Sequence, residues 1–389
     1  MSTLQAAPAA TSGTSRVESP ARLAPLDLLR GFAVAAMVLV NNPGDYRAVY
    51  RQLAHAGWFG WTFADTIAPL FLWVVGFSLL LTVQRQRANN YSRSRMAGTI
   101  LFRASVLTAI GLVLTAIPRP LPLFSWTALE HFRVLGVLQR IAVCYAATGF
   151  LIVYGSETAR RVSTLASLVI YWLLMVYVSV PGFGPGILQP DGNLSQYLDR
   201  MLLGQHANRY EAWGVLSTVP AIGTTLLGVE AACWFSNSKA RHRLSVAAAS
   251  SLGLFLAGLV TSAYFPLSKN LWSPPYVLLN GGLSLAGFAL FIAWHTSRFL
   301  PFVRRVLASL GRQALPVFVV TIALANLLEK TGIPALGKPW ISFKGILFAY
   351  LFRPWGSPEL MSAAYAMVWV IGSIMLANWL TRRNISFRF

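Results

Sequence analysis

The chain has 389 residues, of which 56% are hydrophobic and only 11% are charged. This composition excludes an ordinary soluble globular domain and predicts an integral membrane protein embedded in a lipid bilayer. The net charge of +20 is compatible with nucleic-acid binding. However, the Lys and Arg residues lie in short segments between apolar runs, where positive charge sets membrane topology, so we expect no nucleic-acid partner.

Long apolar runs predict transmembrane helices. A hydrocarbon core of roughly 30 Å is crossed by about 20 apolar residues in a helix, whereas a membrane β-barrel would alternate polar and apolar residues. Ten runs are suitable: 26–40, 63–83, 97–117, 134–154, 162–180, 215–234, 244–264, 276–294, 303–328 and 360–380. The predicted fold is therefore an all-α polytopic helix bundle.

The remaining sequence adds little further architecture. Residues 1–22 are rich in Ala, Ser, Thr and Pro and predict a disordered cytoplasmic tail, not a signal peptide. Residues 23–389 form a single predicted membrane domain. Cys144 and Cys233 lie inside apolar runs and are interpreted as small core residues. No P-loop, dinucleotide-binding or HExxH motif occurs, and no metal site is predicted.

Basic residues predict the orientation of the bundle. They concentrate in alternate connections, which the positive-inside rule assigns to the cytoplasm together with both termini: 85–103, 160–161, 239–243, 298–305 and 382–388. The opposite connections are longer, aromatic and rich in Pro, and they contain His55, which we therefore expect to face the outside. The apolar stretch 346–352 is too short to span a membrane and predicts an interfacial or re-entrant segment.

Several charged residues lie near the predicted cytoplasmic ends of the apolar runs. Asp27 and Arg30 are three residues apart on one helix face, where they can pair. A charge within a membrane is a functional hypothesis by default, although a structural ion pair is the simpler alternative. Arg30 together with Arg312 would suit a phosphate-bearing ligand, and Glu230 would be the counter-charge that holds an arginine in place.

The segment from Asn41 to Pro69 concentrates polar chemistry between two apolar runs. His55 precedes Asp65 by ten residues, and a carboxylate beside an imidazole fixes its tautomer and supports a general base. The amide of Asn41 is a candidate donor to an oxyanion. The alternative is that His55, like most isolated loop histidines, is only solvated or packed.

Further polar and aromatic residues have two interpretations each. Arg140 lies just inside the fourth run and either takes part in a site or extends to the interface. Trp58, Trp61 and Trp272 are candidates for stacking against a sugar ring, but tryptophan is also enriched at membrane interfaces for physical reasons unrelated to ligands.

Five segments in order resemble one family. They are LDLLRG (26–31), LVNNPG (39–44), HAGWFGWTFAD with PLFLWVVG (55–65 and 69–76), GVLQRIA (136–142) and KNLWSPPYVLL (269–279). The sequence resembles the heparan-alpha-glucosaminide N-acetyltransferase family of membrane acyltransferases over nearly the whole membrane domain. One departure is Leu135, where the family often has proline, and another is the short N-terminal tail in place of a large lumenal domain.

The resemblance implies transfer of an acetyl group from cytosolic acetyl-CoA to an amino sugar or glycan acceptor across the membrane. It implies that His55 is the active-site histidine, and it matches the family's asparagine, aspartate and two arginines to Asn41, Asp65, Arg30 and Arg140. Lys269, Asn270 and Trp272, from the fifth segment, join Arg140, Trp58 and Trp61 as expected acceptor-binding residues. A bacterial inner membrane and a possible homodimer are further expectations.

The positions of the polar residues and the family resemblance together predict one mechanism. Arg30 and Asn41 are eleven residues apart, about 16 Å of helix, a distance that an extended pantetheine arm can cover. His55 is then a general base or an acyl-accepting nucleophile, with Asn41 and Arg140 beside the oxyanion. The competing hypotheses are a transporter or flippase whose buried charges line a substrate pathway, and a catalytically inactive membrane scaffold.

Overall fold

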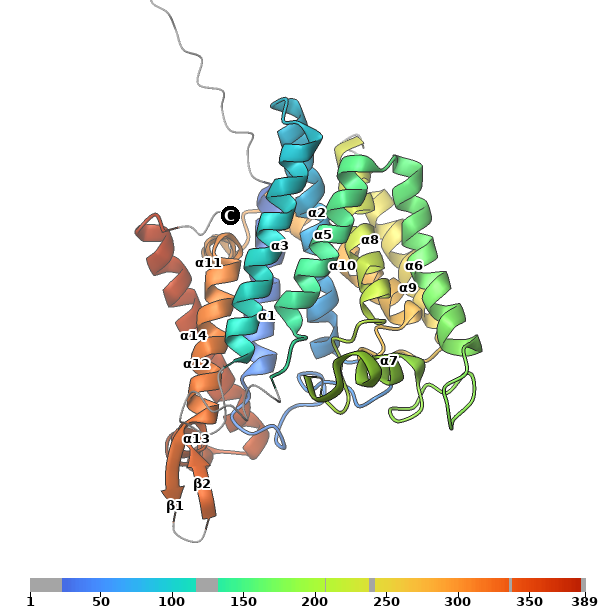
Figure 1. Ribbon diagram of the computed structural model, residues 1–389. Coiled ribbons are helices and arrows are strands. Elements are labelled where there is room, and N and C mark those ends of the chain that lie inside the picture. The colour runs from blue at the N-terminus through green and yellow to red at the C-terminus, as the bar shows by residue number, and fades with distance from the viewer. Residues whose placement is uncertain (1–22, 117–131, 207, 238–241, 336–337, 386–389) are drawn as a thin grey trace, which may run out of the picture.

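The computed structural model describes residues 23–116, 132–206, 208–237, 242–335 and 338–385. Within these ranges the chain forms a helix bundle with one short hairpin of strands (Figure 1), so the predicted all-α polytopic fold is confirmed. The predicted tail, residues 1–22, lies outside the described residues. A single membrane domain over 23–389 stays a prediction.

The helices occupy the predicted runs with small changes at their ends. In chain order the elements are α1 (Ala24–Asn41), η1 (Phe63–Thr66), α2 (Ile67–Ala88), α3 (Arg93–Thr115), α5 (Val137–Tyr154), α6 (Glu157–Tyr177), α7 (Leu194–Leu203), η2 (Gly204–His206), α8 (Thr218–Asn237), α9 (Arg243–Thr261), α10 (Pro274–Thr296), α11 (Pro301–Arg312), α12 (Ala314–Lys330), β1 (Gly332–Ala335), β2 (Lys338–Ser342), α13 (Phe343–Leu351), η4 (Arg353–Trp355) and α14 (Pro358–Arg382).

Among the described residues, nine helices are long and apolar enough to cross a membrane, and the bent pair of α11 and α12 makes a tenth if the two helices together form one span. The ninth predicted run is therefore not one straight helix, because α11 and α12 meet at a bend of 79°. The other nine predicted runs each match one helix. The agreement follows from lipid itself, in which a spanning segment must satisfy its own backbone hydrogen bonds.

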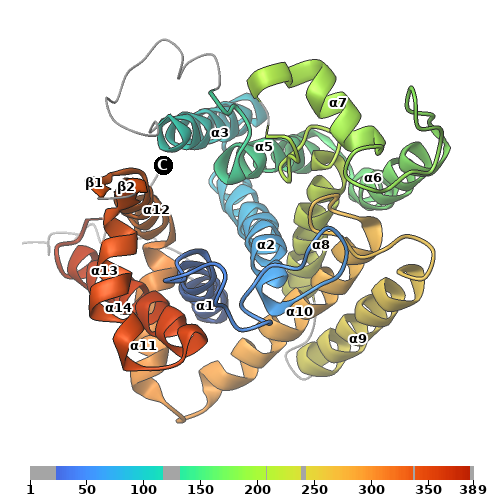
Figure 2. The same cartoon turned by 90° about the horizontal axis from the view of Figure 1, so that it is seen from below.

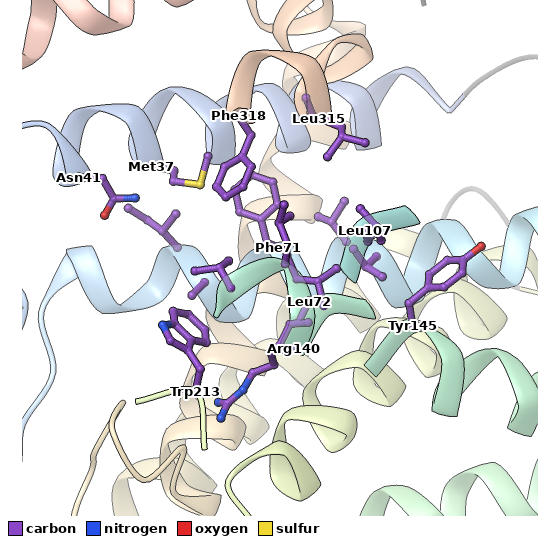
Figure 3. A pocket seen from close by; sticks show the side chains of 18 of the residues that line it. Met37, Asn41, Phe71, Leu72, Leu107, Arg140, Tyr145, Trp213, Leu315 and Phe318 are labelled. Atoms are coloured by element: carbon purple, nitrogen blue, oxygen red, sulfur yellow. The ribbon is translucent and has the colours of Figure 1, made fainter. Parts of the chain in front are cut away.

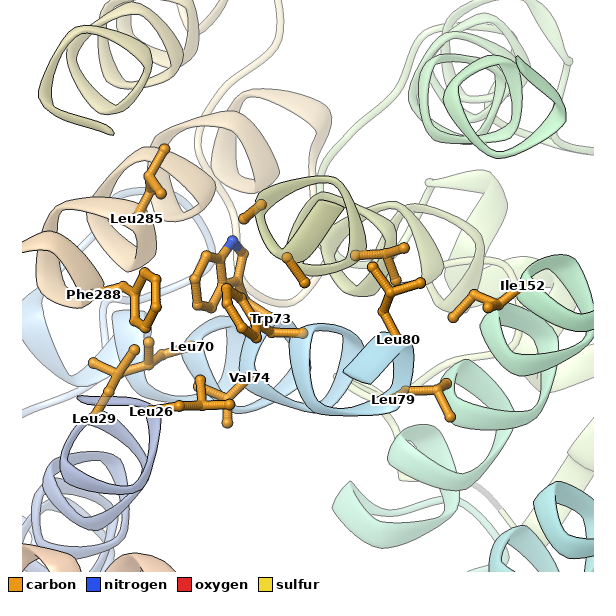
Figure 4. Packing of buried hydrophobic residues seen from close by; sticks show 14 of the residues in the cluster. Leu26, Leu29, Leu70, Trp73, Val74, Leu79, Leu80, Ile152, Leu285 and Phe288 are labelled. Atoms are coloured by element: carbon orange, nitrogen blue, oxygen red, sulfur yellow. The ribbon is translucent and has the colours of Figure 1, made fainter. Parts of the chain in front are cut away.

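Helix α2 lies at the centre of the bundle (Figure 2). Its Trp73 and Phe77 pack against Phe288 of α10, with ring centroids 5.8 Å and 4.8 Å apart. Leu79 and Leu80 extend the same core toward α5 and α8 (Figure 4). Because apolar side chains bury α2 on most sides, it forms a rigid wall for any site beside it.

Two helix crossings depend on glycines from both partners. Gly31 and Gly311 pair α1 with α11, and Gly76 and Gly228 pair α2 with α8. A Cβ at any of the four would lie 2.0 Å or less from a backbone carbonyl oxygen of the facing helix. Close backbone approach at small residues is typical of helix packing in membranes.

The first and the last residues that the structure describes, 23 and 385, lie on the same side of the bundle. The side-chain amide of Gln313 donates to the backbone carbonyl of Ile385 at 2.9 Å, and Gly311 packs against the backbone of Asp27. These contacts place the start of α1 and the end of α14 beside the end of α11. Which side of the membrane this is stays a prediction from the basic connections.

The opposite face carries structure that the hydropathy pattern does not predict. The amphipathic helix α7 lies across it, and β1 and β2 form an antiparallel hairpin (Figure 1). The apolar stretch 346–352 corresponds to α13, a helix of nine residues. Its Phe348 contacts the ring of Tyr365 in α14, with centroids 6.1 Å apart. The helix is too short to span a bilayer, as expected, whereas its position relative to lipid stays a prediction.

Candidate active site

One cavity of about 630 Å³ runs through the bundle between α1, α2, α3, α5 and α12. On α2 its lining extends from Ile67 to Thr82, which are fifteen positions or about 22 Å of helix apart. His55 and Asn41 line one end, called here the histidine end, and Arg30 and Arg103 line the other, the arginine end. Between them the wall is mainly apolar, with Met37, Phe71, Leu72, Leu107, Leu315 and Phe318 (Figure 3).

The histidine end holds an imidazole hydrogen-bonded to a buried carboxylate. Nδ1 of His55 lies 2.8 Å from Oδ1 of Asp65, whose side chain is 1% exposed. The other oxygen, Oδ2, accepts hydrogen bonds from the backbone N–H groups of Ala56 at 3.0 Å and Thr62 at 3.2 Å. A carboxylate held in this way fixes the ring, and an Nδ1–H donated to it leaves the lone pair on Nε2 free to accept a proton.

Local sequence explains why the loop returns to this point. Thr62 and Asp65 form a capping box at the start of η1, in which each side chain receives a backbone N–H of the other residue. The hydroxyl of Thr62 also donates to the carbonyl of Ala54, and the side chain of Gln52 accepts from the backbone N–H of Phe63. The loop that carries His55 is thereby fastened to the helix that carries Asp65.

Lys269 joins this pair from the loop between α9 and α10. Its Nζ lies 3.1 Å and 3.2 Å from Nδ1 and Nε2 of His55 and 3.6 Å from Oδ1 of Asp65. Burial lowers the pKa of the Lys269 ammonium to about 8, although the neighbouring carboxylate favours the charged form. The side chain of Lys269 is 16% exposed. Both Lys269 and Asn270 line the cavity.

Three hydrogen bonds hold the Lys269 loop against the His55 loop. They are Gly60 N–H to Leu267 O at 2.8 Å, Ser268 Oγ–H to Trp58 O at 2.6 Å, and Asn270 Nδ2–H to Gly57 O at 3.3 Å. Two segments that are more than 200 residues apart in sequence therefore form one surface. Lys269 and Asn270 are brought to the site as expected.

Arg140 lies in the cavity wall and is buried inside the bundle. Only 2% of the residue is exposed, and its Nη2 donates to the carbonyl of Gly214 and the hydroxyl of Ser217. The guanidinium lies 5.2 Å from the ring of Trp213 and 5.0 Å from that of Trp272. Its Nε and Nη1 are buried and have no hydrogen-bond partner in the described part of the chain, so these two atoms remain as possible donors.

The three predicted stacking tryptophans do not line the cavity within the described residues. Trp272 is fully buried and donates from Nε1 to the hydroxyl of Thr224. Trp58 donates to the carbonyl of Leu188, and Trp61 packs in the cluster around Trp272. The tryptophan that does line the cavity is Trp213, which the sequence reasoning missed.

Asn41 ends α1 and lines the cavity at the histidine end (Figure 3). The neighbouring Asn42 has a different role, because its buried side-chain amide donates to the carbonyl of Val38 at 2.8 Å. Of the two asparagines that close the helix, the structure therefore leaves Asn41 to face the cavity, as the sequence reasoning expected.

The arginine end is organised around Arg30. Its Nη1 donates to Asp27 at 2.8 Å and its Nη2 to the hydroxyl of Ser78 at 2.7 Å. Arg103 of α3 lines the same end, with Nη1 3.5 Å from the hydroxyl of Tyr145. The predicted Asp27–Arg30 pair is thus present, and Asp27 orients the arginine that faces the cavity.

Arg312 and Glu230 do not line this end in the described part of the chain, although Gly311, the residue before Arg312, accepts a hydrogen bond from Arg30 at 3.4 Å. Glu230 lies at the contact of α8 with α6, where its Oε2 is 3.3 Å from Arg161 and its Oε1 is 3.9 Å from Arg160. Arg312 is exposed at the end of α11. The described lining of the cavity includes neither residue. The second cation at the arginine end is Arg103, which the sequence reasoning had assigned to a basic connection.

Fold and site together define a polytopic membrane protein with an imidazole–carboxylate pair at one end of an internal cavity and cations at the other. The family described as "Heparan-alpha-glucosaminide N-acetyltransferase, catalytic" matches residues 22–262, and the chain belongs to this family. The predicted family is therefore confirmed. The match includes Arg30, His55 and Asp65, whereas Lys269 lies beyond it.

Two curated relatives are similar over most of the chain. The heparan-alpha-glucosaminide N-acetyltransferase of Homo sapiens is 29% identical over 328 residues, which is 70% of this chain and 48% of the relative. That of Mus musculus is 29% identical over 333 residues, 72% of this chain and 49% of the relative. The chain thus spans about half the length of the curated relatives it matches.

Proposed function

We propose that this protein is a membrane-embedded acetyltransferase that moves an acetyl group from cytoplasmic acetyl-CoA to an amino sugar or glycan on the opposite side of the membrane. The observation that carries the proposal is that Arg30 lines one end and His55 the other end of the same cavity. Membership of the acetyltransferase family and the names of both relatives support the reaction class.

The donor would bind with its phosphates at the arginine end. Arg30 and Arg103 supply positive charge there, and guanidinium groups suit phosphate oxygens geometrically. The apolar middle of the cavity would hold the pantetheine arm, so that the thioester reaches His55 while the nucleotide stays on the side of the basic connections. The volume of about 630 Å³ lies in the range of small-molecule and cofactor sites.

The chain's own groups account for the transfer step. His55, held by Asp65, removes a proton from the acceptor amine as the amine attacks the thioester carbonyl. The two unpartnered guanidinium nitrogens of Arg140, with the amide of Asn41, are the candidate donors to the developing oxyanion. In the variant mechanism, His55 itself accepts the acetyl group before passing it to the acceptor.

The acceptor would enter at the histidine end. Trp213 and Asn270 line the cavity there and offer an aromatic face and an amide to a sugar. Transfer to nitrogen rather than oxygen follows the relatives' names. The homodimer and the bacterial inner membrane stay predictions.

A sided assay tests the proposal. Purified protein is reconstituted in liposomes that enclose glucosamine. Vesicles in which the arginine end of the protein is accessible from the medium are then selected. Acetyl-CoA labelled in the acetyl group and added outside should label the enclosed glucosamine. The proposal fails if glucosamine on the inside stays unlabelled while the protein is folded and binds CoA.

A transporter is the second candidate, and the 79° break between α11 and α12 favours it, because interrupted helices mark substrate sites in many transporters. The same vesicles separate the two functions. A transporter would move unmodified sugar or CoA across the membrane, whereas the proposed enzyme would move only the acetyl group.

A further inference from the structure

Lys269 places a primary amine against the proposed base. Its Nζ is nearly equidistant from the two ring nitrogens of His55, at 3.1 Å and 3.2 Å, so it lies over the ring and within hydrogen-bond distance of Nε2. It also lies 3.6 Å from Asp65. The hydrogen bonds between the 57–60 and 267–270 segments hold it there.

An acceptor amine has to lie within the same distance of His55. A general base takes a proton from a group within about 2.6–3.2 Å of it, and His55 can do so from Nε2 because Nδ1 faces Asp65. The amine of Lys269 and the amine of an amino sugar are chemically alike. Both would meet the same base and the same thioester at the histidine end of the cavity.

We propose that Lys269 occupies the acceptor-amine position and is itself acetylated by the bound acetyl-CoA when no acceptor is present, which shuts the site. This inference rests on the proposed function. In the step, the neutral amine attacks the thioester carbonyl, a C–N bond forms and the C–S bond breaks. The amine proton passes to His55 and from there to the departing CoA thiolate, which leaves as the free thiol.

The surroundings of Lys269 supply the neutral amine that the step needs. With a pKa of about 8, about a quarter of the side chain is neutral at pH 7.5. Acetylation would replace this titrating amine by a neutral amide that is bulkier and still lies against His55. An amide is not a leaving group for further transfer, so the modified chain would stay inactive until the acetyl group is removed.

The test is mass spectrometry of the purified protein after incubation with acetyl-CoA, with and without glucosamine. Lys344 is the matched control, because it is also partly buried with a lowered pKa and packs over Tyr46, but does not line the cavity. We expect Lys269 to be acetylated at least ten times faster than Lys344, and glucosamine or His55→Ala to slow this at least tenfold.

Activity gives a second measurement. After preincubation with acetyl-CoA alone, the transferase rate of the unaltered protein should fall in step with the acetylation of Lys269. Lys269→Arg, which cannot be acetylated in the same way, should keep its own starting rate. A protein that transfers acetyl groups to glucosamine but shows no modification of Lys269 when it is given acetyl-CoA alone overturns this inference alone, as does equal modification of Lys269 and Lys344 that survives His55→Ala. Absence of both transfer and modification overturns the proposed function as well.

Discussion

The two ends of the cavity are built differently. At the histidine end, Asp65 is 1% exposed, both of its oxygens are bonded, and each contact restricts the orientation of His55. At the arginine end, the side chain of Arg30 is 23% exposed and donates to a carboxylate, a hydroxyl and, at 3.4 Å, the carbonyl of Gly311, and Arg103 lies 3.5 Å from the hydroxyl of Tyr145.

This difference indicates that the histidine end depends on the orientation of its groups and the arginine end on their charge. A base must be directed at one proton, and small displacements cost rate, so the histidine end needs its orienting hydrogen bonds. A phosphate-binding end needs cations in reach but tolerates side-chain movement, because charge attraction is less directional. Substitutions at the histidine end should therefore change turnover, and substitutions at the arginine end should change donor affinity.

The largest effect is expected for His55→Ala. Loss of a general base lowers the rate by about 10²–10⁴-fold, while acetyl-CoA binding at the other end should persist. Single-turnover transfer and equilibrium binding of acetyl-CoA, measured on the same preparation, check this. Transfer at the original rate would remove His55 from the mechanism and leave the histidine end without its assigned chemistry.

Asp65→Asn is the next test of the same end. The amide keeps the shape of the side chain but can present N–H to Nδ1 of His55, which favours the wrong tautomer. We expect turnover to fall by roughly 10²-fold, the lower end of the range for losing general-base catalysis, with little change in acetyl-CoA affinity. A fall in affinity with unchanged turnover would show that Asp65 acts on the donor instead of on the imidazole.

Arg30→Gln tests the arginine end. Loss of a charge-assisted contact costs about 1.5–3 kcal/mol, so the Kd for CoA should rise about ten- to a hundredfold. Turnover at saturating donor should change less. Titration calorimetry measures the Kd for CoA of this variant and of a control, Arg312→Gln. Arg312 lies outside the described lining of the cavity. Equal losses for the two variants would contradict the assignment of the donor to the cavity.

Much of the fold was predictable because lipid imposes a simple rule on sequence. Each of nine predicted apolar runs matches one helix, since the membrane requires long apolar segments. The bend near Gln313 was missed because both halves, α11 and α12, fall within one apolar run. The α7 helix was missed because it lies in a polar connection and owes its position to tertiary contacts.

The site was predictable only where its residues lie close in sequence. His55 and Asp65 are ten residues apart and meet as expected. Arg312 and Glu230 were grouped with Arg30 by depth alone, but an apolar helix does not reveal which face meets a cavity. Arg103 was missed because it resembled the last charge of a basic connection.

The smallest effect is expected for substitution of Asp199, a carboxylate near Arg140. Unlike Asp65, it does not have hydrogen bonds to both of its oxygens. Its Oδ1 accepts from the backbone N–H of Val215 at 2.7 Å, whereas Oδ2 has no partner among the described residues. Burial, together with the charge of Glu211, raises its pKa to about 6 from an ordinary value of 3.8.

The folded protein therefore binds this proton more tightly than the unfolded chain, so Asp199 favours folding at low pH and loses that contribution as pH rises through about 6. Asp199→Asn removes the titration. Relative to the unaltered protein, its Tm should rise by a few degrees between pH 5 and pH 8, which corresponds to about 2 kcal/mol at most. Asp191→Asn, an exposed carboxylate in the same connection, should show no such rise. Parallel Tm profiles of Asp199→Asn and the unaltered protein across this range would mean that Asp199 has hydrogen-bond partners in solution. The carboxylate near Arg140 would then be as fully hydrogen-bonded as Asp65.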